Sequence, residues 1–98
     1  MNTTTTLTIQ EAAQFVLDDT SDSATHYLRV RTESLTALLR VSAVSDRFLT
    51  GREVSRDSDG LVGATDRLHF IELSQVRWVK VIAHDNKYLE FTTVMEAK

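Results

Sequence analysis

The stretch from Leu68 to Ile82 constrains the fold more than any other part of the chain. It reads LHFIELSQVRWVKVI, two apolar runs separated by the polar pair Ser74 and Gln75. Short apolar runs rich in β-branched residues and bounded by polar ones are typical of buried β-strands. We therefore predict two strands here, joined by a very tight turn and lying side by side as antiparallel neighbours.

Further strands are predicted on both sides of this stretch. Apolar and charged residues alternate over 27–32, as expected of a strand with one buried face. The segment 35–44 fits a helix or a strand, and we predict a strand because apolar residues also occupy alternate positions there. It continues over 47–56, where Gly51 would permit a bend or a bulge. Later strands are predicted over 61–64 and 87–94, after turns at 56–60 and 85–86.

The N-terminal part of the chain predicts one helix. Thr8 and Glu11 have the spacing of a capping box, in which each side chain satisfies a backbone N–H at a helix start. Apolar residues at helical spacing follow, up to the acidic residues Asp18 and Asp19, where we expect the helix to end in a loop over 20–23. So short a helix must dock on the rest of the fold.

One short helix followed by five or six closely connected strands predicts a mainly β fold. Specifically, we expect a strongly bent antiparallel sheet that forms a small barrel. The 98 residues suffice for one modest core. We expect residues 1–8 to be a flexible leader and residues 9–98 to be a single domain.

Composition excludes several classes of function. The chain has no cysteine, which rules out disulfides and cysteine-ligated zinc and favours a reducing compartment. None of its three histidines lies at a metal-ligand spacing, and no glycine-rich phosphate loop is present. No apolar run approaches the ~20 residues of a membrane span. We expect a soluble cytoplasmic protein that is not an enzyme, with no cofactor, no metal, no membrane partner and no identified small-molecule substrate.

The charges are divided along the chain. The net charge is −3, yet residues 29–56 hold six arginines against three acids, while residues 1–24 hold four acids and no base. The arginine-rich segment favours an anionic partner, although it falls short of the basic stripe that dominates binding to phosphate backbones.

Two short motifs carry a resemblance to a known family. Residues 46–50 read Asp-Arg-Phe-Leu-Thr after an alternating strand and a turn, and residues 71–76 read Ile-Glu-Leu-Ser-Gln-Val. Together with the order of elements, they resemble the two motifs of the Sm-like family, ring-forming RNA-binding barrels of SH3-like shape. The resemblance covers roughly residues 9–82. It implies an N-terminal helix, a strongly bent five-stranded sheet and assembly into a homo-oligomer, with the strand at 87–94 as an addition.

Three positions depart from the family pattern. Thr50 replaces the amide that hydrogen-bonds a base, Glu72 replaces a cation that contacts the nucleotide, and Leu73 replaces a glycine. An acid at this place repels phosphate, and losing a contact to a base removes roughly 1–3 kcal/mol per nucleotide. The resemblance therefore carries over the fold but not the RNA site.

The candidate nucleic-acid-binding residues follow from these observations. Phe48 and Trp78 are each either stacking platforms or part of the core, and Trp78 could also lie in a subunit interface. The strand face of Arg29 and Arg31 is either an anion-binding surface or an ordinary solvated face. The full set that we assign is Arg29, Arg31, Arg47, Phe48, Thr50, Ser74 and Gln75.

We expect a non-enzymatic homo-oligomer that assembles through edge strands and binds single-stranded RNA weakly. The alternative is a protein–protein interaction or structural module without nucleic-acid binding, in which the strand at 87–94 covers the assembly edge. A ligand-sensing barrel is the third alternative.

Overall fold

A computed structural model describes residues 7–19, 24–85 and 87–98 of the chain. Most of the predicted leader and the predicted loop over 20–23 lie outside these residues, as does Asn86 of the predicted last turn. The elements in chain order are α1 (Ile9–Leu17), β1 (Ala24–Thr32), β2 (Thr36–Val44), β3 (Phe48–Arg56), β4 (Val62–Glu72), the 3₁₀-helix η1 (Leu73–Gln75), β5 (Val76–Asp85) and β6 (Glu90–Ala97).

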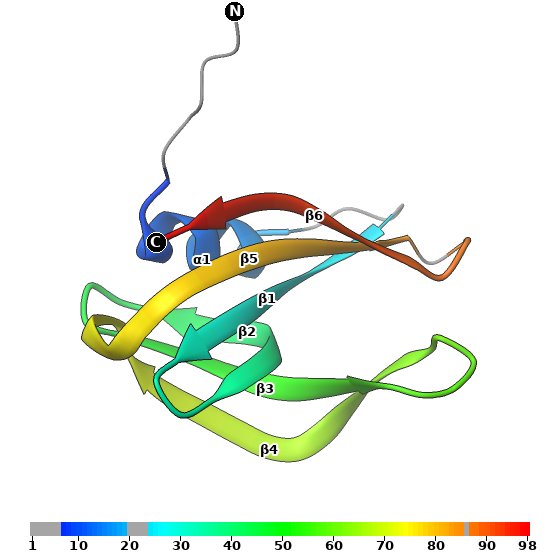
Figure 1. Cartoon of the computed structure of the whole chain (residues 1–98), viewed down its shortest axis with the longest axis horizontal. Coiled ribbons are helices and arrows are strands. Elements are labelled where there is room, and N and C mark those ends of the chain that lie inside the picture. The colour runs from blue at the N-terminus through cyan, green and yellow to red at the C-terminus, as the bar shows by residue number, and fades with distance from the viewer. Residues whose placement is uncertain (1–6, 20–23, 86) are drawn as a thin grey trace, which may run out of the picture.

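The six strands form one antiparallel sheet in the order β4-β3-β2-β1-β5-β6 (Figure 1). The prediction of a mainly β fold with one short N-terminal helix is therefore confirmed. The strand predicted over 35–44 is β2, in which Ala37, Leu39 and Val41 are buried as the alternation predicts, whereas Ala43, which follows a shift of register, is exposed. No helix among the described residues is long and apolar enough to span a membrane.

The capping box predicted for α1 is present. The hydroxyl of Thr8 accepts a hydrogen bond from the Glu11 N–H at 3.1 Å, and the Glu11 carboxylate accepts one from the Thr8 N–H at 3.0 Å. Leu17 is the last helical residue, as expected. The buried face of the helix consists of Ala12, Ala13 and Val16, whose small side chains allow α1 to pack closely on the sheet.

The main core lies between α1 and one face of the sheet. Leu28 and Val30 of β1 point into it, which confirms the period-two pattern of that strand. The other large, fully buried side chains come from the neighbouring strands: Leu39, Leu49, Val79 and Val81.

The predicted pairing of the strands on either side of Ser74 and Gln75 is wrong. β4 lies at the edge of the sheet beside β3, whereas β5 pairs with β1 along its length, from Asp85↔Ala24 to Val76↔Thr32. A two-residue hairpin needs residues such as Asn-Gly that accept positive φ angles, and this pair lacks them. The chain instead forms one 3₁₀ turn, η1, which carries it from the edge strand to the far side of β1.

The sheet is strongly bent but does not close into the predicted barrel. β4 and β6 are its two edges and do not pair with each other. The bend nevertheless brings β3 against β6, since the Arg56 guanidinium lies 4.9 Å from the centre of the Phe91 ring. Gly60 in the β3–β4 turn also lies close to Leu89 in the β5–β6 turn. Both turns are at the right of Figure 1.

A second buried cluster accompanies this bend, on the sheet face opposite α1. Tyr27, Ile82 and His84 are 7%, 2% and 4% exposed, although they alternate with residues of the main core. The His84 ring stacks on Phe91 with centroids 4.4 Å apart. Both faces of β1 and β5 are therefore partly buried.

The predicted boundaries differ most at three strands, β1, β4 and β6. β1 begins at Ala24 rather than Tyr27. The strand expected over 61–64 is the beginning of β4, which continues to Glu72. The last strand begins at Glu90 rather than Lys87, because residues 87–89 form a turn in which Leu89 has a φ of 56°. The Asp85 carboxylate stabilises this turn by accepting hydrogen bonds from the Lys87 and Tyr88 N–H groups.

The irregularity expected near Gly51 lies on the partner strand β2 rather than at the glycine itself. Gly51 pairs regularly with Val41 and His69, while the neighbouring shift of register lies on β2, between Val41 and Ala43. A Cβ atom at this position would lie 3.0 Å from the Arg40 carbonyl oxygen. Close approach of two strands is therefore the reason for the glycine.

Candidate nucleic-acid interface

An aromatic pair lies at the end of the β2–β3 hairpin, with Phe70 exposed and Phe48 half-buried. The rings of Phe48 on β3 and Phe70 on β4 have centroids 4.8 Å apart, and Phe70 is 69% exposed. The Arg47 guanidinium lies 5.6 Å from the centre of the Phe48 ring. We call Arg47, Phe48 and Phe70 the aromatic patch. Exposed rings beside a cation are suited to stack on nucleobases.

The β2–β3 turn positions this patch through Ser45. The Ser45 hydroxyl accepts hydrogen bonds from the N–H groups of Arg47 and Phe48 at 3.3 and 3.0 Å. The Ser45 N–H also donates to the Phe48 carbonyl at 2.8 Å. A serine in a tight turn thus holds Arg47 at the tip and Phe48 at the start of β3.

The register of β3 and β4 places Phe70 and Thr50 next to Phe48. Thr50 pairs with Phe70, and Phe48 pairs with Glu72, so the alternation of both strands places these side chains on the sheet face opposite the main core. A hollow of about 180 Å³ opens there, lined by Ala43, Val44, Ser45, Phe48, Thr50 and Phe70.

The two motif segments that carry the Sm-like resemblance meet at this place. The Leu73 N–H donates a hydrogen bond of 2.8 Å to the Arg47 carbonyl, so the start of η1 lies against the β2–β3 turn. Glu72 brings a carboxylate to the same end of the sheet, opposite Phe48. Its charge opposes phosphate binding next to the rings.

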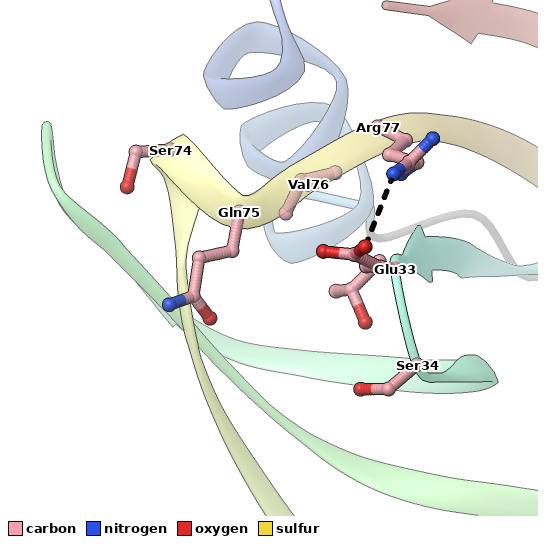
Figure 2. A pocket seen from close by; sticks show the side chains of 7 residues that line it. Glu33, Ser34, Ser74, Gln75, Val76 and Arg77 are labelled. Carbon is pink, nitrogen blue, oxygen red and sulfur yellow. Dashed lines mark ion pairs between the residues drawn. The ribbon is translucent and has the colours of Figure 1, made fainter.

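Ser74 and Gln75 lie instead in a second hollow, between η1 and the β1–β2 turn (Figure 2). It has a volume of about 450 Å³, and its lining also includes Glu33, Ser34 and Arg77. Arg77 forms an ion pair with Glu33 at 3.8 Å, and the Ser74 side chain points away from that pair. This hollow is polar and its arginine is paired, which makes it a poor phosphate site.

Arg29 and Arg31 lie on β1, on the same sheet face as the aromatic patch but away from its residues. Arg29 is opposite Lys80 and Arg31 is opposite Trp78 in the β1–β5 register. The Arg31 guanidinium donates to the Thr36 hydroxyl at 2.7 Å. Trp78 is half-buried, with the Lys80 ammonium 4.9 Å from its ring centre, so it offers less free surface than Phe70.

The sequence interpretation missed Phe70, Arg40 and Arg52. Phe70 belongs to a run in which each face carries a large apolar residue, since Leu68 and Phe70 alternate with His69 and Ile71. Only the pairing with Thr50 shows which face is free. The two arginines were counted in the local charge excess, but their direct opposition, Arg40↔Arg52, depends on the β2–β3 register.

Burial raises the pKa of the Tyr27 phenol, and the nearby Arg40 guanidinium partly offsets this effect. His26 is 2.7 Å from the Asp19 carboxylate, and His69 is 3.0 Å from that of Glu53. Nowhere in residues 7–19, 24–85 and 87–98 do three His, Cys, Asp or Glu side chains group closely enough to hold a metal ion.

The fold and the patch together define a small, strongly bent antiparallel-sheet domain with an exposed aromatic and cationic surface. A scan against protein-family models, a search of curated proteins and a search of solved structures each found no match to the chain.

Proposed function

We propose that this chain is a non-enzymatic, Sm-like module that self-associates and binds single-stranded RNA weakly. The observation that carries the proposal is the aromatic patch, in which Phe48 and Phe70 lie 4.8 Å apart beside the Arg47 guanidinium. Every nucleobase has a flat face, so an exposed ring accepts bases of any sequence.

The Sm-like part of the proposal is supported by two features of the fold. A short helix precedes a strongly bent antiparallel sheet, and the two motif segments touch through the Arg47–Leu73 hydrogen bond. The departures at Thr50 and Glu72 remain, and they favour weak, sequence-tolerant binding over readout of a particular base.

Self-association is supported by the two open edges of the sheet. β4 and β6 each present a row of unpaired backbone groups, which is a template for pairing with another chain. Because β6 covers the outer edge of β5, copies that join edge to edge would pair β4 of one with β6 of the next.

Titration of labelled U-rich and A-rich single strands, followed by fluorescence anisotropy, tests RNA binding. Phe70→Ala should weaken binding about 5- to 150-fold, because one lost base stack is worth about 1–3 kcal/mol. Tyr88→Ala is the matched control, since Tyr88 is 62% exposed but lies in the β5–β6 turn. Absence of binding by the unaltered protein at low salt, where electrostatic affinity is greatest, would refute the RNA proposal.

A protein–protein interaction module is the second candidate. Leu68 and Phe70 are 60% and 69% exposed on the edge strand β4, and neighbouring Glu72 favours a partner other than a polyanion. This function is favoured if the unaltered protein binds no single-stranded RNA at low salt, while Phe70→Ala still lowers the mass of the assembly that the protein forms in solution.

A further inference from the structure

Besides Arg56, which lies against Phe91, four arginines lie on the face of the sheet opposite α1, along three neighbouring strands. They are Arg29 and Arg31 on β1, Arg40 on β2 and Arg52 on β3, and we call them the arginine face. Their shared orientation follows from the registers, because Arg40 pairs with Arg52, while Arg29 pairs with Leu38, two residues from Arg40.

This face has an unfavourable distribution of charge in the isolated molecule. Arg40 and Arg52 are directly opposite each other and both are exposed, and like charges at such positions destabilise a sheet. Arg29 is opposite Lys80 in the same way. Lys80 has a carboxylate partner, Glu96 at 3.9 Å, whereas none of the four arginines forms an ion pair within the described residues.

An anion lying between opposed guanidinium groups turns this repulsion into attraction. Each guanidinium presents several N–H donors in a planar fork that matches phosphate oxygens. Arg52 uses one of its nitrogens to donate to the Thr65 carbonyl of β4 at 3.1 Å, which holds the guanidinium beside this edge strand and leaves its other donors available. Strands at the centre of a sheet are also rigid supports for such a site.

The arginine face is continuous with the aromatic patch. Thr50, which is opposite Phe70, lies two residues from Arg52 on β3 and therefore on the same face. A single-stranded RNA whose base stacks on Phe70 would reach Arg52, Arg40 and Arg29 with its next phosphates. This continuity favours a chain of phosphates over a single bound anion.

We propose that the arginine face binds the phosphate backbone of the single strand whose bases stack on the aromatic patch. The inference rests on the proposed function and adds Arg40 and Arg52 to the site. It predicts two separable contributions to affinity: one from the rings, which is insensitive to salt, and one from the arginines, which is strongly salt-dependent.

The test measures affinity for one labelled single strand at several salt concentrations. For single strands, log K falls with log salt by about 0.7 for each phosphate contact. The double variant Arg40→Gln, Arg52→Gln should therefore reduce the slope by about 1.4. The matched control is Arg67→Gln, Arg77→Gln, which removes the same charge outside the arginine face and should leave the slope unchanged. Phe70→Ala should weaken binding at every salt concentration without changing the slope.

The outcomes separate the inference from the proposed function. Equal slopes for the two double variants, in a protein that still binds the strand, would overturn the arginine face and leave the stacking function intact. Loss of all binding by the unaltered protein would overturn both.

A ligand-free readout gives an independent check on the charge opposition. At low salt, Arg40→Gln alone should raise the melting temperature or leave it unchanged, and adding Arg52→Gln should give little further gain, because the first change already removes the repulsion. A melting temperature that falls in step with each change would contradict opposed, unpaired charges and would overturn the inference.

Discussion

Gly51 shows how a single residue determines how closely two strands approach. A Cβ atom there would lie 3.0 Å from the Arg40 carbonyl oxygen and 3.1 Å from the Leu39 Cβ. Gly51→Ala should therefore destabilise the protein by about 1–3 kcal/mol, as extra atoms do in packed interiors. In a domain of this size, each kcal/mol lowers the melting temperature by about 4–8 °C, which thermal unfolding will detect.

Gly63→Ala provides the control for this prediction. A Cβ atom at Gly63 would meet nothing within 4 Å. An alanine there reduces the entropy of the unfolded chain, so stability should stay the same or rise slightly. Equal losses at the two positions would contradict the proposed crowding between β2 and β3.

The capping box predicts a pH dependence at the start of α1. Hydrogen bonds from the Thr8 N–H and hydroxyl group hold the pKa of Glu11 below its usual value of 4.5. A carboxyl group with a lowered pKa stabilises the fold above its unfolded pKa, and this contribution is lost as pH falls through the folded value. The stability difference between the unaltered protein and Glu11→Gln should thus be full near neutral pH and should shrink in acid, as pH falls below 4.5 and through the lowered folded pKa.

Thr8→Ala distinguishes the cap from the charge. It removes the N-cap hydroxyl and should cost about 1 kcal/mol near neutral pH. The loss from Thr8→Ala should persist in acid, because a hydroxyl cap does not need the Glu11 charge. Chemical unfolding of the three proteins at neutral pH and in acid measures this, and a difference for Glu11→Gln that is constant with pH would refute the assignment.

At the scale of elements, local patterns were sufficient where a structure depends on neighbours in sequence. The capping residues Thr8 and Glu11 and the alternation of Leu28 and Val30 are such cases, because the hydrogen bonds and the buried face involve residues a few positions apart. The partner of β5 depends instead on residues 24–32, far away in the chain. The Ser74–Gln75 pair, which lacks the residues of a two-residue hairpin, is a local signal against pairing with β4, but no local signal identifies β1 as the partner.

The same limit applied to the candidate site. Arg47, Phe48 and Thr50 could be found because they lie together in one motif, and the structure places them at one end of β3. Phe70 could not be found, because the side of β4 that stays exposed is determined by a bent sheet rather than by the strand's own pattern. Ser74 and Gln75 were adjacent in sequence to the second motif, yet η1 directs them to another hollow.

The prediction about assembly concerns the two edge strands, β4 and β6. Leu68 on β4 is 60% exposed and Val94 on β6 is 47% exposed. A lysine on an edge strand opposes pairing with another chain, so Leu68→Lys and Val94→Lys should each lower the mass of the assembly. Light scattering over a range of concentrations measures this mass against the 11.1 kDa of one chain.

Gln10→Lys is the control for the edge variants, because it adds the same charge on an exposed position of α1. It should leave the mass unchanged. A uniform mass of one chain at high concentration in the unaltered protein would exclude assembly through either edge and would favour the monomeric interaction module.

At the scale of the whole molecule, the bend of the sheet depends on contacts between its two ends. The Phe91 ring of β6 stacks on His84 at 4.4 Å and carries the Arg56 guanidinium of β3 at 4.9 Å. Three strands separate β3 from β6 in the sheet, so this ring joins parts that backbone pairing does not connect. Burial of the second cluster beneath it depends on the same contact.

Phe91→Ala should therefore loosen the ends of the sheet while leaving the core under α1 in place. A partly buried phenylalanine truncated to alanine should cost about 1–3 kcal/mol, less than a fully buried one. Hydrogen exchange should become faster in β6 and at the β3–β4 turn, while the amides of β1 and β2 beside the main core stay protected. Tyr88→Ala, in the adjacent turn, should change neither stability nor exchange. Uniformly faster exchange in Phe91→Ala would mean that the sheet opens as one unit, because the bent end would then have no stability separate from the rest.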